Sequence, residues 1–480
     1  MTPVPLRQNH NLTLGVLVLS ALAFALTQTM VAPALPAIQK ELGTSATEVT
    51  WVLTVFLLTA SIATPIIGRL GDMFGKERVL LAVLGVFAIG SIVGALSHSI
   101  ETLIAARAIQ GVAGAIFPLA FGIIRDEFPR ERVATGIGLI SATFGIGGGA
   151  GLVLSGVIVD NLSYEWIFWL GLIVIAIAAV ATYFFVPESP VKTPAKIDWA
   201  GAALLSGTLV SLLLGVSQGN DWGWSSARVL GLFAASAILA MLWVRFELRV
   251  PQPLVDMRMM RGRAVWTTNL TGLLLGFGMF GSFILIPQLV QLPESTGFGF
   301  GATVTQAGLF LIPSSIAMLF AGPIAGTLAG RFGSRFPLLI GTFTASSSFA
   351  LLAIAHTEAW EIYLASALMG VGIGLSFASM ANLIVEAVPQ TQTGVATGMN
   401  TIMRTIGGSI GGSIAASIVA AHLLGGFPRE SGFTEAFAIS SIAVFVAFLA
   451  ALAIPRRERS TARATALSPA FDRTSVGSPR

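Results

Sequence analysis

The chain has 480 residues, of which 54% are hydrophobic and only 10% are charged, and its mean hydropathy is +0.84. Soluble proteins carry about 25% charged residues, so this composition excludes an ordinary water-soluble enzyme, which would need far more polar surface around its core. The net charge is +4, and the absence of cysteine excludes disulfides, thiolate catalysis and cysteine-based metal sites. A polytopic membrane protein is the class that remains.

Fourteen apolar stretches follow one another along the chain, and each is long enough to cross a bilayer, which takes about 20 residues. They are predicted near residues 12–34, 48–68, 79–97, 102–124, 133–158, 166–187, 198–217, 228–246, 264–290, 303–328, 337–356, 360–384, 394–421 and 435–454. The predicted fold class is therefore an all-α integral membrane protein with 14 transmembrane helices. An even number of spans places both termini on one side of the membrane.

Lysine and arginine gather on one side of these predicted spans. Of the 27 basic residues, 22 fall in the N-terminus, the even-numbered connections and the C-terminal tail. Basic loops stay in the cytoplasm, so we predict that both termini are cytoplasmic, in the cytoplasmic membrane of a bacterium. The positive charge is thus a topology signal, and no nucleic-acid partner is expected. The first span has no small-residue cleavage pattern behind it and is expected to stay as an anchor.

The two ends of the chain repeat one another. The sequence GRLGDMFG at 68–75 recurs as GTLAGRFG at 326–333, Val-Ala-Thr-Gly at 133–136 recurs at 395–398, and Gly147, Gly148 and Gly151 recur as Gly407, Gly408 and Gly411. We predict an N-terminal six-helix bundle (12–187), two inserted transmembrane helices with a loop (197–263), a C-terminal six-helix bundle (264–455) and a disordered cytoplasmic tail (456–480). Two six-helix halves around a central site are typical of transporters.

Two motifs carry a resemblance to a known family. The loop GRLGDMFGKER at 68–78 and the sequence Arg-Ala-Ile-Gln-Gly at 107–111 resemble the signatures of the major facilitator superfamily. Fourteen spans and the sequence Ile-Asp-Trp-Ala-Gly at 197–201 resemble its fourteen-span drug:proton antiporter branch. The resemblance covers about residues 12–455. It implies a secondary active transporter of the multidrug-efflux type, which exports small amphipathic or lipophilic compounds by alternating access in exchange for protons.

In this superfamily the loop at 68–78 belongs to a latch at the cytoplasmic ends of the helices. We therefore expect Asp72 to act as a gating residue among basic neighbours, and a weaker latch in the second half, where Gly330 replaces it. Asp126 and Glu386 occupy equivalent helix ends and are expected to pair with basic residues such as Arg331. The alternative is that these charges only hold the orientation or solvate the helix ends. The full set of expected gating residues is Gly68, Asp72, Gly75, Lys76, Arg78, Arg125, Asp126, Arg331 and Glu386.

Glycines crowd the fifth and thirteenth predicted spans. Gly147, Gly151, Gly407 and Gly411 are spaced by four residues, which lets two helix backbones approach closely, so we expect them to serve helix packing. The antiporter branch has a Gly-Pro pair in the fifth span, whereas this chain has Gly151-Leu152. Tight helix packing is enough to explain these glycines. The missing proline weakens the prediction that the protein is an antiporter.

The expected substrate contacts are polar residues placed within the spans: Thr27, Gln28, Arg107, Asn269, Gln288, Asn400 and Arg404. Arg107 matches the arginine of the family's fourth-helix motif, implying proton coupling or substrate contact, although a structural arginine bonded to carbonyls is the alternative. Arg404 is a second candidate, and its alternative is snorkelling to the inner surface. The branch has an aspartate where this chain has Thr27, and threonine cannot carry a proton. Phenylalanines such as Phe24, Phe117, Phe121, Phe277 and Phe280, with Gln291, are candidates for the cavity wall.

The expected partners follow from these observations. They are a small-molecule substrate, protons as a coupling ion and membrane lipids, without a cofactor or metal, and we expect a monomer. A facilitator, importer or exporter of a neutral metabolite without proton coupling is the competing transport function. A membrane enzyme is disfavoured because the four histidines are scattered and no phosphate-binding loop is present.

Overall fold

The computed structural model of the chain describes residues 9–192, 196–424 and 427–455, so the tail predicted to be disordered (456–480) lies outside the described residues. The elements in chain order are α1 (His10–Leu42), α2 (Ala46–Phe74), α3 (Lys76–Ala95), α4 (Ile100–Gly111), η2 (Val112–Ala115), α5 (Ile116–Glu127), α6 (Arg130–Asn161), α7 (Glu165–Phe185), α8 (Trp199–Ser217), α9 (Gly219–Trp222), α10 (Ala227–Glu247), α11 (Met257–Met260), α12 (Arg263–Gln291), η3 (Glu294–Thr296), α13 (Val304–Phe332), α14 (Arg335–Ile354), α15 (Ala359–Ala387), η4 (Gln390–Gln392), α16 (Thr393–Ala421), β1 (Leu423–Leu424), β2 (Phe427–Pro428) and α17 (Glu430–Leu452).

The predicted spans are confirmed, because the described residues form 14 helices that are long and apolar enough to cross a membrane. The fourth span is continuous in space but is built from α4, the short 3-10 turn η2 and α5. Several helix starts follow from local sequence. Ser45 caps α2 with Glu48 in a reciprocal capping box, and Thr303 caps α13 with Gln306 in the same way.

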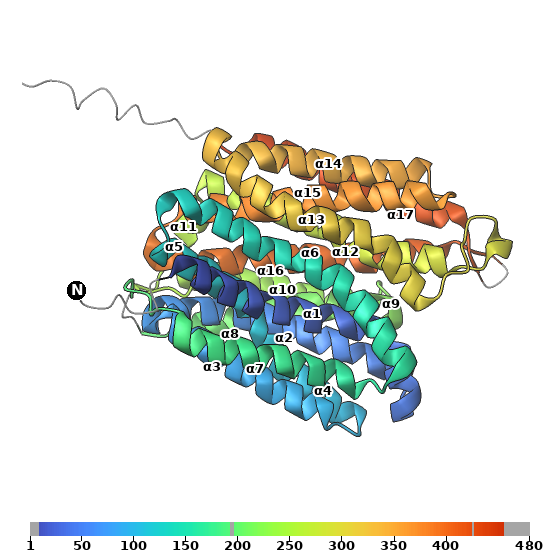
Figure 1. Cartoon of the computed structure of the whole chain (residues 1–480), viewed down its shortest axis with the longest axis horizontal. Helices are drawn as coiled ribbons and strands as arrows, with labels where there is room; N and C mark the ends of the chain where they lie inside the picture. Colours follow the sequence, from blue (N-terminus) through green and yellow to red (C-terminus); the bar gives the residue numbers. More distant parts are fainter. Residues whose placement is uncertain (1–8, 193–195, 425–426, 456–480) are drawn as a thin grey trace, which may run out of the picture.

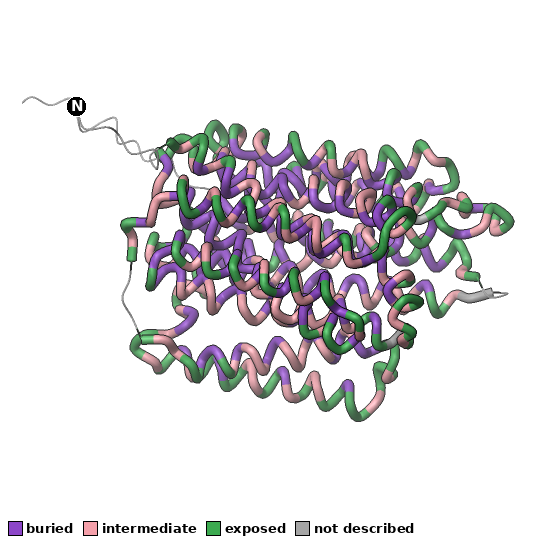
Figure 2. Tube along the Cα trace, turned by 60° about the horizontal axis from the view of Figure 1, so that its bottom comes forward, coloured by how far each residue is buried: buried purple, intermediate pink, exposed green. Residues whose placement is uncertain are grey.

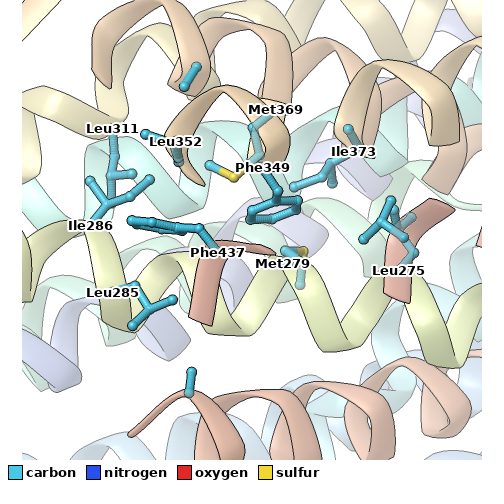
Figure 3. Packing of buried hydrophobic residues seen from close by; sticks show 14 of the residues in the cluster. Leu275, Met279, Leu285, Ile286, Leu311, Phe349, Leu352, Met369, Ile373 and Phe437 are labelled. Atoms are coloured by element: carbon cyan, nitrogen blue, oxygen red, sulfur yellow. The ribbon is translucent and has the colours of Figure 1, made fainter. Parts of the chain in front are cut away.

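The long helices run side by side in two groups (Figure 1), with α13, α14, α15 and α17 along one face and α3, α4 and α7 along the other. The first of these groups packs around the apolar side chains of α12. Figure 3 shows Phe349 of α14, Met369 of α15 and Phe437 of α17 beside Met279 of α12. In Figure 2 exposed residues follow the outer sides of the helices. Many of them are large and apolar, such as Met241 of α10, as expected for a surface that contacts lipid.

The inserted helix α8 lies against both halves, and α10 packs on α8. Ser236 of α10 donates to the carbonyl of Thr208 in α8 (3.0 Å), which ties the two inserted helices together. The far end of α8 then meets one helix from each half. Ser217 bonds Thr54 of α2 (3.1 Å), and the Ser413 hydroxyl of α16 donates to the carbonyl of Val216 (3.1 Å). The inserted helix α8 therefore lies across the interface at which α2 of the first half meets α16 of the second, which we call the seam.

The sequence repeat corresponds to paired contacts between the halves. A Cβ atom added to Gly68 of α2 would lie 2.6 Å from the carbonyl oxygen of Gly394 at the start of α16. In the mirrored contact, a Cβ atom on Gly326 of α13 would lie 2.6 Å from the Cα of Thr135 near the start of α6. Each glycine thus lets its helix touch the Val-Ala-Thr-Gly segment of the other half, which explains why both motifs are present twice.

Candidate functional site

One end of the bundle, which we call the basic end, carries residues 68–78, which form the end of α2 and the start of α3 rather than a loop, together with the start of α1 and the end of α17. At this end the Asp72 carboxylate of α2 caps a helix of the opposite half. It accepts hydrogen bonds from the backbone N–H groups of Gly394 (3.1 Å) and Val395 (3.4 Å) in the first turn of α16. A helix N-terminus carries partial positive charge and unpaired N–H groups, so a carboxylate is stabilised there. Asp72 is only 1% exposed.

Lys76 joins this carboxylate to a second one. Its ammonium lies 3.4 Å from the Asp72 Oδ1 and 2.6 Å from the Asp126 Oδ2, and all three side chains are fully buried. The Ser189 hydroxyl also donates to Asp126. Asp126 therefore pairs within its own half, with Lys76, rather than with a basic residue such as Arg331 from the other half. Asp72 lies in the last turn of α2 and Lys76 begins α3, so the break at Gly75 separates them and helical spacing in the sequence does not reveal this contact.

Arg125 provides a second bridge between the halves. Its guanidinium donates to the carbonyl oxygens of Val388 (2.6 Å) and Pro389 (3.2 Å) and to the hydroxyl of Thr393, the first residue of α16. Together with Asp72 it holds the connection between α15 and α16 against α2 and α5. We call Asp72, Arg125 and the first turn of α16 the latch.

The other expected gating residues surround the latch. Gly75 has a φ of 111°, a left-handed value that glycine adopts readily, and it connects α2 directly to α3. Arg78 pairs with Glu188 (3.0 Å), but its side chain is 72% exposed, so this ion pair contributes little. In the second half, Glu386 accepts a hydrogen bond from Ser334 (2.9 Å). A Cβ atom on Gly330, the counterpart of Asp72, would meet no atom within 4 Å.

Three cavities lie in a row away from the latch. The largest, about 270 Å³, lies between α1, α2, α4 and α6 on one side and α12 and α13 on the other. A neighbouring cavity of about 50 Å³ reaches Thr64 of α2 and Thr401 of α16, and shares Gln28, Phe144 and Phe280 with the first. A third, of about 260 Å³, extends toward Pro36 and Gln291 near the opposite end. Toward the basic end the row ends near Thr64, and beyond it α2 touches α16 at Gly68 and Gly394.

Arg107 is the charged residue on the wall of the largest cavity, and its side chain is completely buried. Its Nε donates to the carbonyl of Val52 (3.2 Å) and its Nη1 to the Oε1 of Gln110 (2.7 Å), while Nη2 has no hydrogen-bond partner. The guanidinium lies 4.0 Å from the ring centre of Phe56. Gln110 is oriented in turn by its bond to Ser91 (2.8 Å).

Arg404 lies on the wall of the smaller cavity and belongs to the other half. Its guanidinium is 4.2 Å from the ring centre of Phe377 and 5.7 Å from that of Phe144, and it donates to the hydroxyl of Thr401 (3.1 Å). The side chain is 7% exposed, so it is held within the bundle and does not snorkel to the surface. Gln28 lines both cavities.

Four of the expected substrate contacts are not among the residues that line these three cavities. Thr27 is turned toward α7, where a Cβ atom on Gly171 would lie 2.9 Å from its hydroxyl oxygen. The Asn400 amide donates to the amide oxygen of Asn269 (3.0 Å), so these two side chains connect α16 to α12. Gln288 is exposed on α12. Successive side chains along a helix point about 100° apart, so a residue in the same span as Gln28 or Arg404 can face away from the cavity.

Several cavity residues were missed by sequence reasoning. Phe144, Phe56, Met279, Phe283 and Met318 line the largest cavity. Phe144 is central, because it stacks on Phe117 with ring centres 4.2 Å apart and also contacts Phe377 of the other half (5.7 Å). No sequence signal separated these side chains from those that face lipid, since both environments are apolar. Of the expected aromatic residues, Phe24, Phe117 and Phe280 lie on cavity walls.

The four glycines expected to serve helix packing lie at close helix crossings. A Cβ atom on Gly147 would collide with Ala25 and one on Gly151 with Thr29, both in α1. In the second half, Gly407 and Gly411 meet the carbonyl oxygens of Leu273 and Phe277 in α12. The Thr29 hydroxyl also donates to the carbonyl of Gly147 (2.6 Å), which fixes α1 against α6 beside the cavity.

The comparisons with known proteins agree with this architecture. The model of the Major Facilitator Superfamily matches residues 17–412 and 290–475. The chain is 28% identical over 393 residues to the tetracenomycin C resistance and export protein of Streptomyces glaucescens, covering 80% of this chain and 71% of that protein. It is 29% identical over 383 residues to the multidrug transporter protein MdtP of Bacillus subtilis (strain 168), covering 79% and 70%.

A solved structure has the same fold. The crystal structure of the human organic anion transporter TETRAN matches with a TM-score of 0.66, covering 92% of this chain and 99% of that chain. At 18% sequence identity this likeness concerns the arrangement of the helices alone.

Proposed function

The chain belongs to the major facilitator superfamily, a family of transporters and not of enzymes, and we propose that it exports small amphipathic or lipophilic compounds by alternating access, in exchange for protons. The relatives named for tetracenomycin C export and for multidrug transport support this substrate class. We propose that the protein acts as a monomer in the bacterial cytoplasmic membrane.

The observation that carries this proposal is the contrast between the two ends of the seam between the halves. At the basic end the latch holds α16 against α2 and α5. Toward the opposite end, the same halves enclose the row of three cavities. Such an arrangement supports a carrier whose latch is closed while its binding space communicates with the opposite side, and which reverses this state when the latch opens.

We further propose that the basic end faces the cytoplasm and the cavities open outward. The arginines of this end, such as Arg130 and Arg258, lie on loops and helix ends where the positive-inside rule favours the cytoplasmic side. Both described ends of the chain, at α1 and α17, then lie on the cytoplasmic side. With its cavities open to the outside, the protein is in the conformation from which an exporter releases its substrate.

A facilitator without proton coupling is the second candidate, and one observation favours it. Among the described residues that line the three cavities, none is aspartate, glutamate or histidine. A proton carrier needs a group whose pKa moves across ambient pH as access alternates, and this is most often a buried carboxylate. If protons are exchanged, Asp72 and Asp126 at the latch are the buried carboxylates to test first.

The deciding experiment uses the purified protein in liposomes that contain a pH-sensitive dye. An imposed pH gradient is challenged with aromatic acids, neutral drugs, lipophilic cations and sugars, and labelled compounds are followed in parallel. Proton exchange predicts that at least one amphipathic compound dissipates the gradient only when the protein is present. Equilibration of a compound without proton movement supports the facilitator. If no amphipathic compound moves in either assay, the proposed function is contradicted.

A further inference from the structure

The cavities between the two halves carry positive charge without a counter-charge. Among the described residues on the walls of the three cavities, Arg107 and Arg404 are the ionisable ones. They approach from opposite halves, Arg107 from α4 and Arg404 from α16. The cavities that they line share Gln28, Phe144 and Phe280, so the two arginines border adjoining cavities.

The surroundings of Arg107 leave part of its binding capacity unused. Its three bonded or stacked neighbours, Val52, Gln110 and Phe56, are all neutral. The bonds to Val52 and Gln110 explain how α4 is attached to α2 and held in place. They do not explain the Nη2 of Arg107, which is fully buried and has no hydrogen-bond partner. Arg107 itself borders the largest cavity. A buried guanidinium without a carboxylate is costly, and an anion that enters the cavity would compensate it.

Arg404 also favours an anion in this space, and it does so from the opposite wall. Its neighbours are the Thr401 hydroxyl and the rings of Phe377 and Phe144, which are again neutral. A cationic compound in this space would face two positive charges and no described negative one. An anionic compound would be attracted by both and would find aromatic rings beside them for its apolar part.

This inference rests on the proposed export function and specifies its substrates. We propose that these two adjoining cavities together bind amphipathic aromatic anions, such as carboxylates or sulfonates. The negative group accepts hydrogen bonds from Arg107, with Arg404 contributing its charge from the opposite half. The ring of the compound packs against Phe144 and Phe280. Arg107 is then a specificity-determining residue, because it selects compounds by their charge.

The test compares three probes that share one ring system but differ in charge. They are naphthalene-1-sulfonate, the neutral naphthalene-1-sulfonamide and the cationic (1-naphthylmethyl)trimethylammonium. Equilibrium binding of each is measured on the purified full-length protein in lipid nanodiscs. We expect the sulfonate to bind roughly tenfold or more tightly than the other two, since only it brings a negative charge to the hydrogen bonds with the guanidinium.

The variants then assign this preference to Arg107. Arg107→Gln is expected to weaken sulfonate binding by roughly tenfold while changing sulfonamide binding by less than about twofold. Arg107→Lys, which keeps the charge, should retain part of the preference. The matched control is Arg228→Gln, because Arg228 also lies over an aromatic ring, Trp222 at 6.0 Å, but lines none of the three cavities. This control should bind all three probes as the unmodified protein does.

Two results would overturn the proposal. One is that the unmodified protein binds the cation or the neutral probe as tightly as the sulfonate, a comparison that needs no variant to fold. The other is that Arg107→Gln weakens all three probes equally. Both leave the proposed export function intact if the protein still transports another amphipathic compound in liposomes. Failure of all transport with sulfonate-selective binding would instead contradict export alone.

Discussion

Replacement of Asp72 by asparagine should open the latch without disturbing the fold around it. Asparagine has the same shape as aspartate, and its amide oxygen can still accept a bond from the N–H of Gly394. The negative charge at the start of α16 is lost, together with the ion pair to Lys76 at 3.4 Å. Lys76 keeps its shorter contact with Asp126 at 2.6 Å, so no buried cation is left alone.

The size of the effect follows from this geometry. A charge at a helix N-terminus contributes up to about 2 kcal/mol where the site is partly buried, and Asp72 is buried. Losing about 2 kcal/mol from the closed state alone changes the ratio of closed to open molecules by roughly 30-fold. A closed-to-open ratio of about 100:1 would become about 3:1, which makes the open state directly observable.

The assay is a distance measurement between spin labels at the basic end. The chain contains no cysteine, so cysteines can be introduced without removing any. Phe74 at the end of α2 and Phe336 at the start of α14 are 53% and 42% exposed and belong to different halves. With both replaced by labelled cysteine, Asp72→Asn should add a population at longer distance.

The matched control for this change is Glu131→Gln, which removes a carboxylate from the exposed first turn of α6 at the same end. It should leave the distances unchanged. Transport should fall in Asp72→Asn while the amount of protein inserted in the membrane stays the same. An Asp72→Asn protein with the original distance distribution and normal transport would refute the latch.

Three further changes test neighbouring parts of the account. Gly68→Ala places a Cβ atom 2.6 Å from the Gly394 carbonyl oxygen, so the labels at the basic end should move apart, whereas Gly85→Ala, with no atom within 4 Å, should leave them in place. Arg125→Gln removes charge-assisted bonds across the seam and should lower export several-fold at saturating substrate with little change in KM; an unchanged export rate would count against a gating role. Gly411→Ala crowds α12 and should cost about 1–3 kcal/mol of stability, seen as a lower Tm in detergent, and a Tm equal to that of Gly85→Ala would contradict the packing argument.

The fold could be predicted because its signals are strong and redundant. Apolar stretches of about 20 residues require spanning helices, since no other backbone structure except a closed barrel satisfies its hydrogen bonds in lipid. The repeated motifs indicated two halves, and the crossing of Gly68 with Gly394 and of Gly326 with Thr135 gives the physical reason for the repeat. The seam-spanning position of α8 could not be predicted, because it depends on contacts between helices distant in sequence.

The site could be predicted only in part. Arg107 and Arg404 were recognised because charged residues within spans are rare, whereas Asp72 was recognised by its place in the 68–78 motif and Asp126 by its place at a helix end. The partner of Asp72 was not recognised, because backbone N–H groups leave no mark in the sequence. Phe144 and its apolar neighbours were missed because lipid and cavity select the same side chains. Thr27 was chosen by its position in a motif, although one residue of helical rotation separates it from Gln28 and the cavity.

The most direct test of alternating access measures both ends of the same protein. Leu96 in the first half and Trp360 in the second are 57% and 61% exposed near the end opposite the latch. Labels at this pair and at the pair Phe74 and Phe336 are compared with and without Asp72→Asn. Alternating access predicts opposite changes, so that the basic end opens while the opposite end closes. Movement of both ends in the same direction, or of the basic end alone, would contradict the account.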